Sequence, residues 1–192
     1  ANTRIAGDDY PHYIALHYSP DYRARRIKDR LEVLDGATVD DMAAVHTEAV
    51  SIPAQVYTAL LVRVTPGDKA SALALEKLKG WDGSMAANEI APTIYSAFRL
   101  SLERALINHN LQDLANDALS ASGRGAPMHV AQLRARFTAA AQNGDTSVLP
   151  PNTDWNLALT MALTEGVAFL QQEYGDDMDS WEWGTVHTTN PK

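Results

Sequence analysis

Residues 86–109 read AANEIAPTIYSAFRLSLERALINH, and this stretch decides the fold. Its apolar side chains recur at helical spacing over a length that no ordinary strand reaches, so it predicts one long α-helix. The turn sequence Trp81-Asp82-Gly83-Ser84 precedes it. Pro92 falls within its first turns, where the missing amide hydrogen is tolerated or produces a kink. A mainly α fold is therefore expected.

Capping signals predict further helices on both sides of this stretch. Ser19 followed by Pro20 is typical of a helix start, and Thr38 with Asp41 forms a variant of the capping box. Further helical segments are predicted after Pro53, after Asp68, near residues 111–121 and 129–142, and from Thr153 to a closing Gly175.

Both ends of the chain carry strand-like sequence. Residues 13–18, Tyr-Ile-Ala-Leu-His-Tyr, predict a short strand, and residues 180–187 are more typical of a strand than of a helix. A single helical domain over residues 1–192 is predicted, with 1–18 and 180–192 as end strands. Because unpaired strand edges associate with other chains, we expect a homodimer formed through an end segment.

Composition excludes several classes of function. The chain has 192 residues, and its 45% apolar and 21% charged residues match an ordinary globular domain. Its formal net charge of −8 argues against nucleic acid as the main partner, because phosphate binding needs a basic surface. No apolar run reaches the roughly 18 residues that span a membrane, so no membrane partner is expected. The absence of cysteine excludes disulfides and thiolate chemistry.

No short motif carries a complete chemistry by itself. The sequence contains no phosphate-binding glycine loop, no HExxH and no GxSxG. His12 and His17 are five residues apart, a spacing that suits neither one helix face nor one strand face. The acids at 8–9 and at 176, 177 and 179 are of the type that binds calcium, but solvated turn or cap acids explain them better.

The basic run Arg23-Ala24-Arg25-Arg26 stands out in an acidic chain. Its simplest interpretation is a solvated helix face with acidic partners such as Asp29. Tryptophans at 81, 155, 181 and 183 are more often core residues than ligand platforms. On composition and spacing alone, the sequence predicts no more than a mainly α domain.

Weak motifs nevertheless follow one another in a fixed order. They are ANTRI at 1–5, GDDYPHY at 7–13, YRARRI at 22–27, Ser51 with Ala54, Leu78 with WDG at 81–83, and WEWG at 181–184 with His187. In order and spacing they resemble consecutive motifs of the penicillin acylase (penicillin amidase) family. Thr3, His46 and Val186 depart from the usual residues of that family, and none of them carries an assigned role.

The resemblance implies an N-terminal-nucleophile hydrolase. Members of the family cut their own precursor and expose a serine, whose hydroxyl attacks an amide carbonyl while its α-amino group acts as the base. The chain resembles an internal part of the second (β) chain, and Ala1 has no hydroxyl. We therefore expect the nucleophile upstream, the chain alone to be inactive, and the fold to be the helical part of an αββα enzyme with short strands at both ends.

The resemblance assigns roles to two residues. Asn2 matches the asparagine whose side-chain amide donates to the oxyanion, a role that suits a neutral donor placed where negative charge develops. Arg26 matches an arginine that lies near the nucleophile and orients it. Arg23 and Arg25 belong to the same motif without a catalytic role.

The resemblance also implies which substrates, partners and cofactors to expect. It implies hydrolysis of linear amides that carry an N-acyl group, and leaves penicillins, cephalosporins and N-acyl-homoserine lactones open. The expected partners are the remainder of the acylase and the small-molecule substrate, and the expected location is the periplasm or outside the cell. Some members hold a structural calcium through an acid after the Asp-Tyr-Pro segment. His12-Tyr13-Ile14 stand there, so no cofactor is expected of this chain.

A second class of function fits the same composition. A stand-alone helical binding or interaction module without catalysis is consistent with the helical content and with the lack of a nucleophile. The mass of the source protein separates the two classes, because an acylase requires a precursor or partner far larger than 20.9 kDa.

Overall fold

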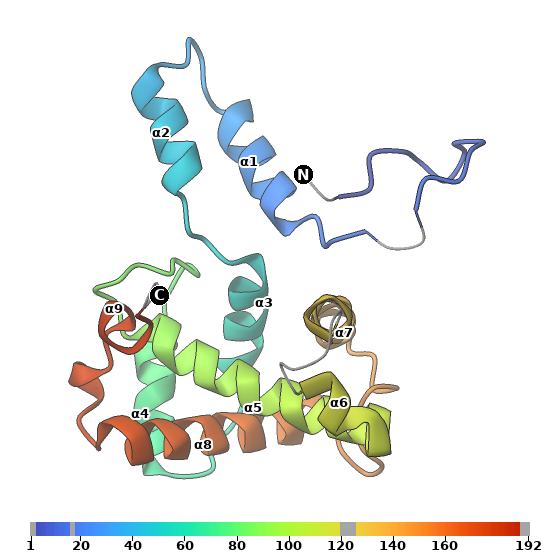
Figure 1. Cartoon of the computed structure of the whole chain (residues 1–192). Coiled ribbons are helices and arrows are strands. Elements are labelled where there is room, and N and C mark those ends of the chain that lie inside the picture. The colour runs from blue at the N-terminus through green and yellow to red at the C-terminus, as the bar shows by residue number, and fades with distance from the viewer. Residues whose placement is uncertain (1–2, 16–17, 120–125, 189–192) are drawn as a thin grey trace. The chain divides into compact units, whose positions relative to one another are not determined.

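A computed structural model describes residues 3–15, 18–119 and 126–188, with the backbone alone for 126–131 (Figure 1). Within these residues the secondary structure is helical and no strand occurs, so the predicted mainly α fold is confirmed. No helix in this described part is both long and apolar enough to cross a membrane. The chain groups into two compact units, Ala1–Val50 and Ser51–Lys192, whereas the sequence predicts one domain over 1–192.

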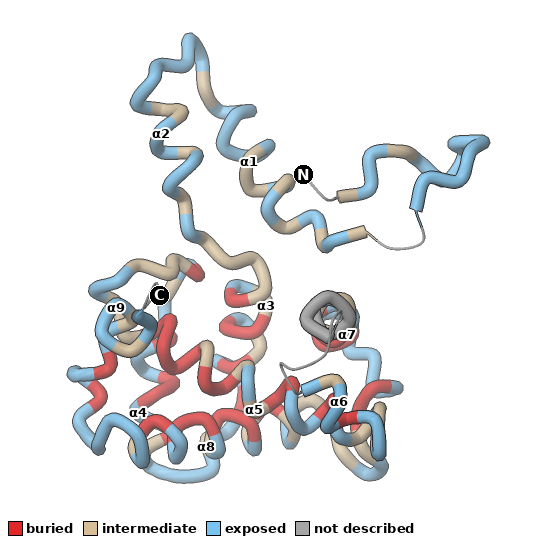
Figure 2. The backbone as a smooth tube through the Cα atoms, viewed as in Figure 1, coloured by how far each residue is buried: buried red, intermediate tan, exposed pale blue. Residues whose placement is uncertain are grey.

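The N-terminal unit, Ala1–Val50, contains two helices, α1 (Tyr22–Glu32) and α2 (Val39–Thr47). None of its described residues is buried, as the tan and pale blue tube of Figure 2 shows. Several of its large apolar side chains are exposed: Ile5, Tyr10, Tyr13, Ile14, Leu31, Val33 and Val39. The described part of this unit therefore has no hydrophobic core of its own.

The first two helix starts differ in how well the sequence predicts them. The capping box at α2 is confirmed, because Thr38 accepts from the Asp41 amide while Asp41 accepts from the Thr38 amide. The start of α1 is corrected from Ser19-Pro20 to Asp21, which makes no side-chain cap bond. The helical ladder begins where the Arg25 amide donates to the Asp21 carbonyl at 2.8 Å.

The C-terminal unit, Ser51–Lys192, contains the core. Its elements are α3 (Ile52–Leu61), α4 (Lys69–Leu78), α5 (Ala91–Leu111), the 3₁₀ turn η1 (Gln112–Leu114), α6 (Ala115–Leu119), α7 (Ala126–Asn143), α8 (Trp155–Tyr174), η2 (Met178–Ser180) and α9 (Trp183–Val186). Helices α5 and α8 lie side by side, α4, α6, α7 and α9 contact α5 or α8, and α3 contacts α7 (Figure 1). The buried residues of α5 and α8 face this shared core, including Ile94, Phe98, Leu102, Leu163 and Val167.

Gly166 sets the separation of α5 and α8. A Cβ atom at this position would lie 2.7 Å from the backbone nitrogen of Phe98 and 2.8 Å from the carbonyl carbon of Ala97. Only a residue without a Cβ lets the two backbones approach this closely. The glycine therefore acts by its lack of a side chain and not by an unusual backbone conformation.

Helix starts in this unit follow the sequence with small shifts. Asp68 accepts from the Ser71 amide, which confirms the predicted start of α4. Ser51 accepts from the Ala54 amide, so α3 begins at Ile52 and not after Pro53 as predicted. Asp154, not Thr153, caps α8 by accepting from the Leu157 amide at 2.8 Å. The helix predicted over 86–109 begins later, at Ala91, because Pro92 then stands in the first turn, where its missing amide hydrogen breaks no helical bond.

The predicted end strands do not form in the described residues. Residues 13–15 and 18 have no regular structure, and Trp183–Val186 is the short helix α9. A strand needs a ladder partner, whereas here the Trp183 and Gly184 amides donate to the carbonyls of Glu89 and Ala87 at 2.8 and 2.7 Å. Pairing of residues 1–18 and 180–192 within a larger enzyme, and a homodimer through them, stay predictions.

Candidate functional site

The two residues to which the sequence analysis gives catalytic roles differ in what the structure describes. Asn2 lies outside the described residues, so its oxyanion role stays a prediction. Arg26 lies on α1 and its side chain is 25% exposed. The geometry around Arg26 is therefore what the structure adds to the candidate site.

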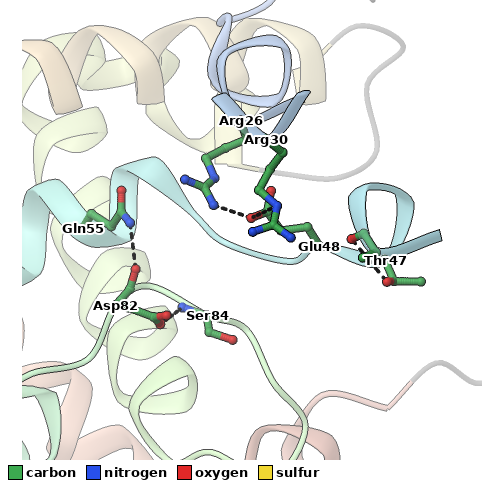
Figure 3. Close-up of polar contacts among 8 residues, drawn as sticks. Arg26, Arg30, Thr47, Glu48, Gln55, Asp82 and Ser84 are labelled. Carbon is green, nitrogen blue, oxygen red and sulfur yellow. Dashed lines mark hydrogen bonds and ion pairs between the residues drawn. The ribbon is translucent and has the colours of Figure 1, made fainter. Parts of the chain in front are cut away.

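Arg26 is paired with an acid that the sequence analysis missed. Its Nη2 donates to Oε1 of Glu48, and Nε of Arg30 lies 3.9 Å from the same oxygen (Figure 3). The Glu48 side chain is only 15% exposed. A partly buried carboxylate between two guanidinium groups makes a charge-assisted contact that solvent screens less than a surface pair.

Local structure explains why these three side chains meet. Arg26 and Arg30 are four residues apart on α1, so they share one helix face. Glu48 is the residue that ends α2, and its extended backbone (φ −62°, ψ 130°) leads the chain out of the helix. The capping box at Thr38 fixes where α2 starts and therefore where it delivers Glu48. No local pattern links Glu48 to Arg26, which is why the sequence did not reveal the pair.

One donor of Arg26 is both buried and unpaired. Its Nε is buried and has no hydrogen-bond partner among the described residues. Leaving a donor of a charged group unpaired costs free energy, so such a group calls for an explanation. Since a guanidinium stays protonated, Arg26 can present positive charge and donors to a substrate or a nucleophile, but it cannot act as a base.

The other arginines of the basic run belong to the helix surface. Arg23 is exposed. Arg25 forms an ion pair with Asp21 at 3.1 Å and lies over the ring of Tyr22, 5.4 Å from its centroid. The solvated helix face that the sequence predicts is therefore found for these two, with Asp21 rather than Asp29 as the acid of the recorded ion pair.

A second charged cluster lies in the C-terminal unit. Glu103 of α5 is buried, and its two oxygens accept from Nε of Arg99 at 2.6 Å and Nε of Arg134 at 2.7 Å. Burial disfavours the charged form of Arg99, but Tyr95 and Glu103 outweigh burial and raise the pKa of its guanidinium. The cluster links α5 to α7. The Arg99 and Glu103 spacing was visible in the sequence, whereas Arg134 was not.

Two buried tyrosines flank this cluster. Burial raises the pKa of the Tyr57 hydroxyl and the pKa of the Tyr95 hydroxyl above their ordinary value. Their rings make edge-on or tilted contacts with Phe98 and Trp81, each with centroids 5.6 Å apart. Neutral hydroxyls packed among aromatic rings belong to the core, and we assign them no chemistry.

Family motifs near 81–83 and 181–184 have structural roles. Gly83 has φ +87°, and the Ser51 amide donates to its carbonyl at 2.9 Å, while Gln55 donates to the Asp82 carbonyl at 2.8 Å (Figure 3). Trp181 is fully buried, and its indole N–H donates to the Gly175 carbonyl at 3.1 Å. These motifs therefore hold the start of α3 and the end of α8 in place.

Three of the residues that the sequence analysis weighed as metal ligands lie against other partners. Asp8 pairs with Arg4 at 2.5 Å, and Asp179 pairs with Lys77 at 2.5 Å. His12 packs edge-on against Tyr10, and His17 lies outside the described residues. Among the described residues no group of three or more His, Cys, Asp or Glu side chains is placed to hold a metal ion.

Comparison with known proteins bears on the family. The family model for penicillin amidase matches residues 1–192, so the chain belongs to the penicillin amidase family. A similar protein is the penicillin acylase 2 proenzyme of Pseudomonas sp. (strain SE83), which is 36% identical over 105 residues. That match covers 54% of this chain and 14% of the relative's length. The resemblance drawn from the ordered motifs is confirmed.

Proposed function

We propose that the chain is part of an amide hydrolase that removes N-acyl groups through an acyl-enzyme. The observation that carries the proposal is the family match over all 192 residues. In this mechanism the N-terminal serine of another segment attacks the carbonyl of a linear amide, and its own α-amino group takes the proton. The C–N bond then breaks, and the departing amine receives that proton and leaves an acyl-serine. Water attacks the acyl-serine, which releases the carboxylic acid and restores the serine hydroxyl.

This chain contributes two groups to the proposed reaction. The amide of Asn2 donates to the oxyanion that develops on the carbonyl oxygen, a stabilisation that is largest in the transition state. Arg26 orients the nucleophile through a guanidinium that Glu48 already holds. The Nε of Arg26, buried and unpaired among the described residues, is one donor that it can offer to the rest of the active site.

The partner in this proposal is the remainder of the acylase. Apolar side chains of the N-terminal unit are exposed, and one apolar surface on α1 is formed by Ala24, Ile27 and Leu31. Exposed apolar surface of this kind marks an interaction site when it is contiguous. The small share of the relative that the match covers, 14%, is consistent with a large partner segment.

The substrate class stays broad. The relative is named for penicillin, and the proposal extends to cephalosporins and N-acyl-homoserine lactones, which share a linear amide. The proposed location is the periplasm or the cell exterior.

Assaying acid release by the complete acylase tests the proposal directly. We expect turnover of phenylacetyl or longer acyl amides by the complete protein, and none by the isolated 192-residue chain. Asn2→Ala should lower kcat by about 10² to 10³ with little change in KM.

Asn156→Ala provides the matched control, since Asn156 is an exposed residue of α8. It should keep the kcat of the wild type. Turnover by the isolated chain would refute the assignment of the nucleophile to another segment. A complete protein that processes normally and hydrolyses no N-acyl amide would refute the function itself.

A further inference from the structure

We propose that Glu48 is a positioning residue that holds the Arg26 guanidinium in the orientation the acylase uses. The inference rests on the proposed function, because it needs Arg26 to act near the nucleophile. It assigns a task to a residue that neither the motifs nor the family match singles out. Its basis is the geometry of one carboxylate and two guanidinium groups (Figure 3).

The Arg26–Glu48 pair differs from the ion pairs of the N-terminal unit whose partners are four residues apart. Lys28 and Glu32, for example, are one helical turn apart, and their side chains are 73% and 61% exposed. Such exposed pairs contribute little, because water screens them and both side chains lose freedom. The Arg26 and Glu48 side chains are 25% and 15% exposed, and the pair joins α1 to the end of α2.

Glu48 also separates two like charges. Arg26 and Arg30 lie one turn apart on α1, a spacing at which like charges repel each other. Oε1 of Glu48, which accepts from Arg26 and lies 3.9 Å from Nε of Arg30, compensates both charges. Without that carboxylate the two guanidinium groups would move apart, and Arg26 would leave the position that its single recorded hydrogen bond defines.

The unpaired Nε donor explains why the orientation of the Arg26 guanidinium matters. A guanidinium is planar and rigid, so holding Nη2 on Glu48 restricts the directions in which Nε can point. That Nε is buried and unpaired among the described residues. A rotation of the group would redirect this donor, and small misplacements of positioning groups cost up to about 10² in rate.

A double-mutant cycle in the complete acylase tests the inference. Glu48→Gln keeps the size of the side chain and removes its charge. We expect kcat to fall by between about tenfold and 10² while KM changes little, because the ground state loses less than the transition state. Glu48→Asp keeps the charge with a shorter reach and should recover part of the loss.

The cycle partner is Arg26→Lys, which keeps the charge and loses the planar fork. If Glu48 acts through Arg26, adding Glu48→Gln to Arg26→Lys should lower kcat no further. Glu32→Gln is the matched control. It removes an exposed acid of α1, the helix that carries Arg26, and should keep wild-type kcat.

The outcomes separate this inference from the proposed function. A wild-type protein that cleaves no N-acyl amide refutes the function. An active wild type with unchanged kcat in Glu48→Gln overturns the inference, as does a full additional loss in the double variant. If Glu48→Gln fails to fold, the same cycle is run with Glu48→Asp. The inference then requires that Glu48→Asp lower the kcat of the wild-type protein and leave the kcat of the Arg26→Lys variant unchanged.

Discussion

Replacing Gly166 with alanine tests whether the α5–α8 contact limits the core. The added Cβ would lie 2.7 Å from the Phe98 nitrogen, and the nearest ordinary contact is 3.4 Å, so the helices must separate by 0.7 Å. The neighbouring atoms belong to the backbone of α5, so no side-chain rotation can relieve the contact. A gap of this size forfeits about a quarter to a half of each affected van der Waals contact.

Two opposing contributions set the magnitude. Overpacking a core costs about 1–3 kcal/mol, and a contact with backbone belongs at the upper end of that range. Alanine in place of glycine gains about 1 kcal/mol of helix propensity. The net expectation for Gly166→Ala is a loss of about 2 kcal/mol in the free energy of unfolding, which lowers Tm by roughly 4–8 °C.

Thermal and urea unfolding of the 192-residue chain, followed by circular dichroism, measure this difference. Ala168→Gly is the control, because Ala168 is exposed on the same helix and reports propensity alone. It should cost about 1 kcal/mol. A Gly166→Ala variant that melts higher than the wild type would show that α8 does not approach α5 as described.

Two further perturbations have defined outcomes. Glu103→Gln should cost about 2 kcal/mol of unfolding free energy in urea unfolding, because Arg99 and Arg134 lose the carboxylate charge that they share. The control Glu165→Gln, at an exposed position, should stay within about 0.5 kcal/mol of the wild type. Hydrogen bonds from the Thr38 side chain and backbone lower the pKa of Asp41, so its contribution to α2 is present above the unfolded pKa and is lost as pH falls through the folded one. Because the intrinsic exchange rate itself falls in acid, the measured quantity is the protection factor, which should decrease for α2 amides as pH falls, and Asp41→Asn should abolish that decrease.

Local signals predicted the parts of the fold that local chemistry determines. Thr38 and Asp68 each cap a helix through a bond that spans three residues, so the sequence alone places them. Gly175 likewise ends α8 with φ +85°. The predicted strand at 180–187 was wrong for Trp183–Val186, which form a short helix. The Trp183 and Gly184 amides donate to the carbonyls of Glu89 and Ala87, which are far away in sequence.

The candidate site was predictable only in part, for the same reason. Arg26 was found through the resemblance to a family motif, and its partner Glu48 was not, because 22 residues and a helix separate the two. The Arg99 and Glu103 pair follows a helical spacing, while Arg134 reaches it from α7. Sequence patterns identify such residue types, and tertiary structure decides which of them meet.

The close contact between α5 and α8 also determines when the protein is prone to aggregation during its synthesis. A ribosome completes α5 long before it reaches α8, so the surface around Phe98 and Leu102 meets its permanent neighbour only near the end of translation. Until then that apolar surface is open to other nascent chains, the condition under which aggregation competes with folding. Pauses between α5 and α8 lengthen this interval, so the timing of translation and access to chaperones should affect yield more than sequence changes on the outer faces of the helices.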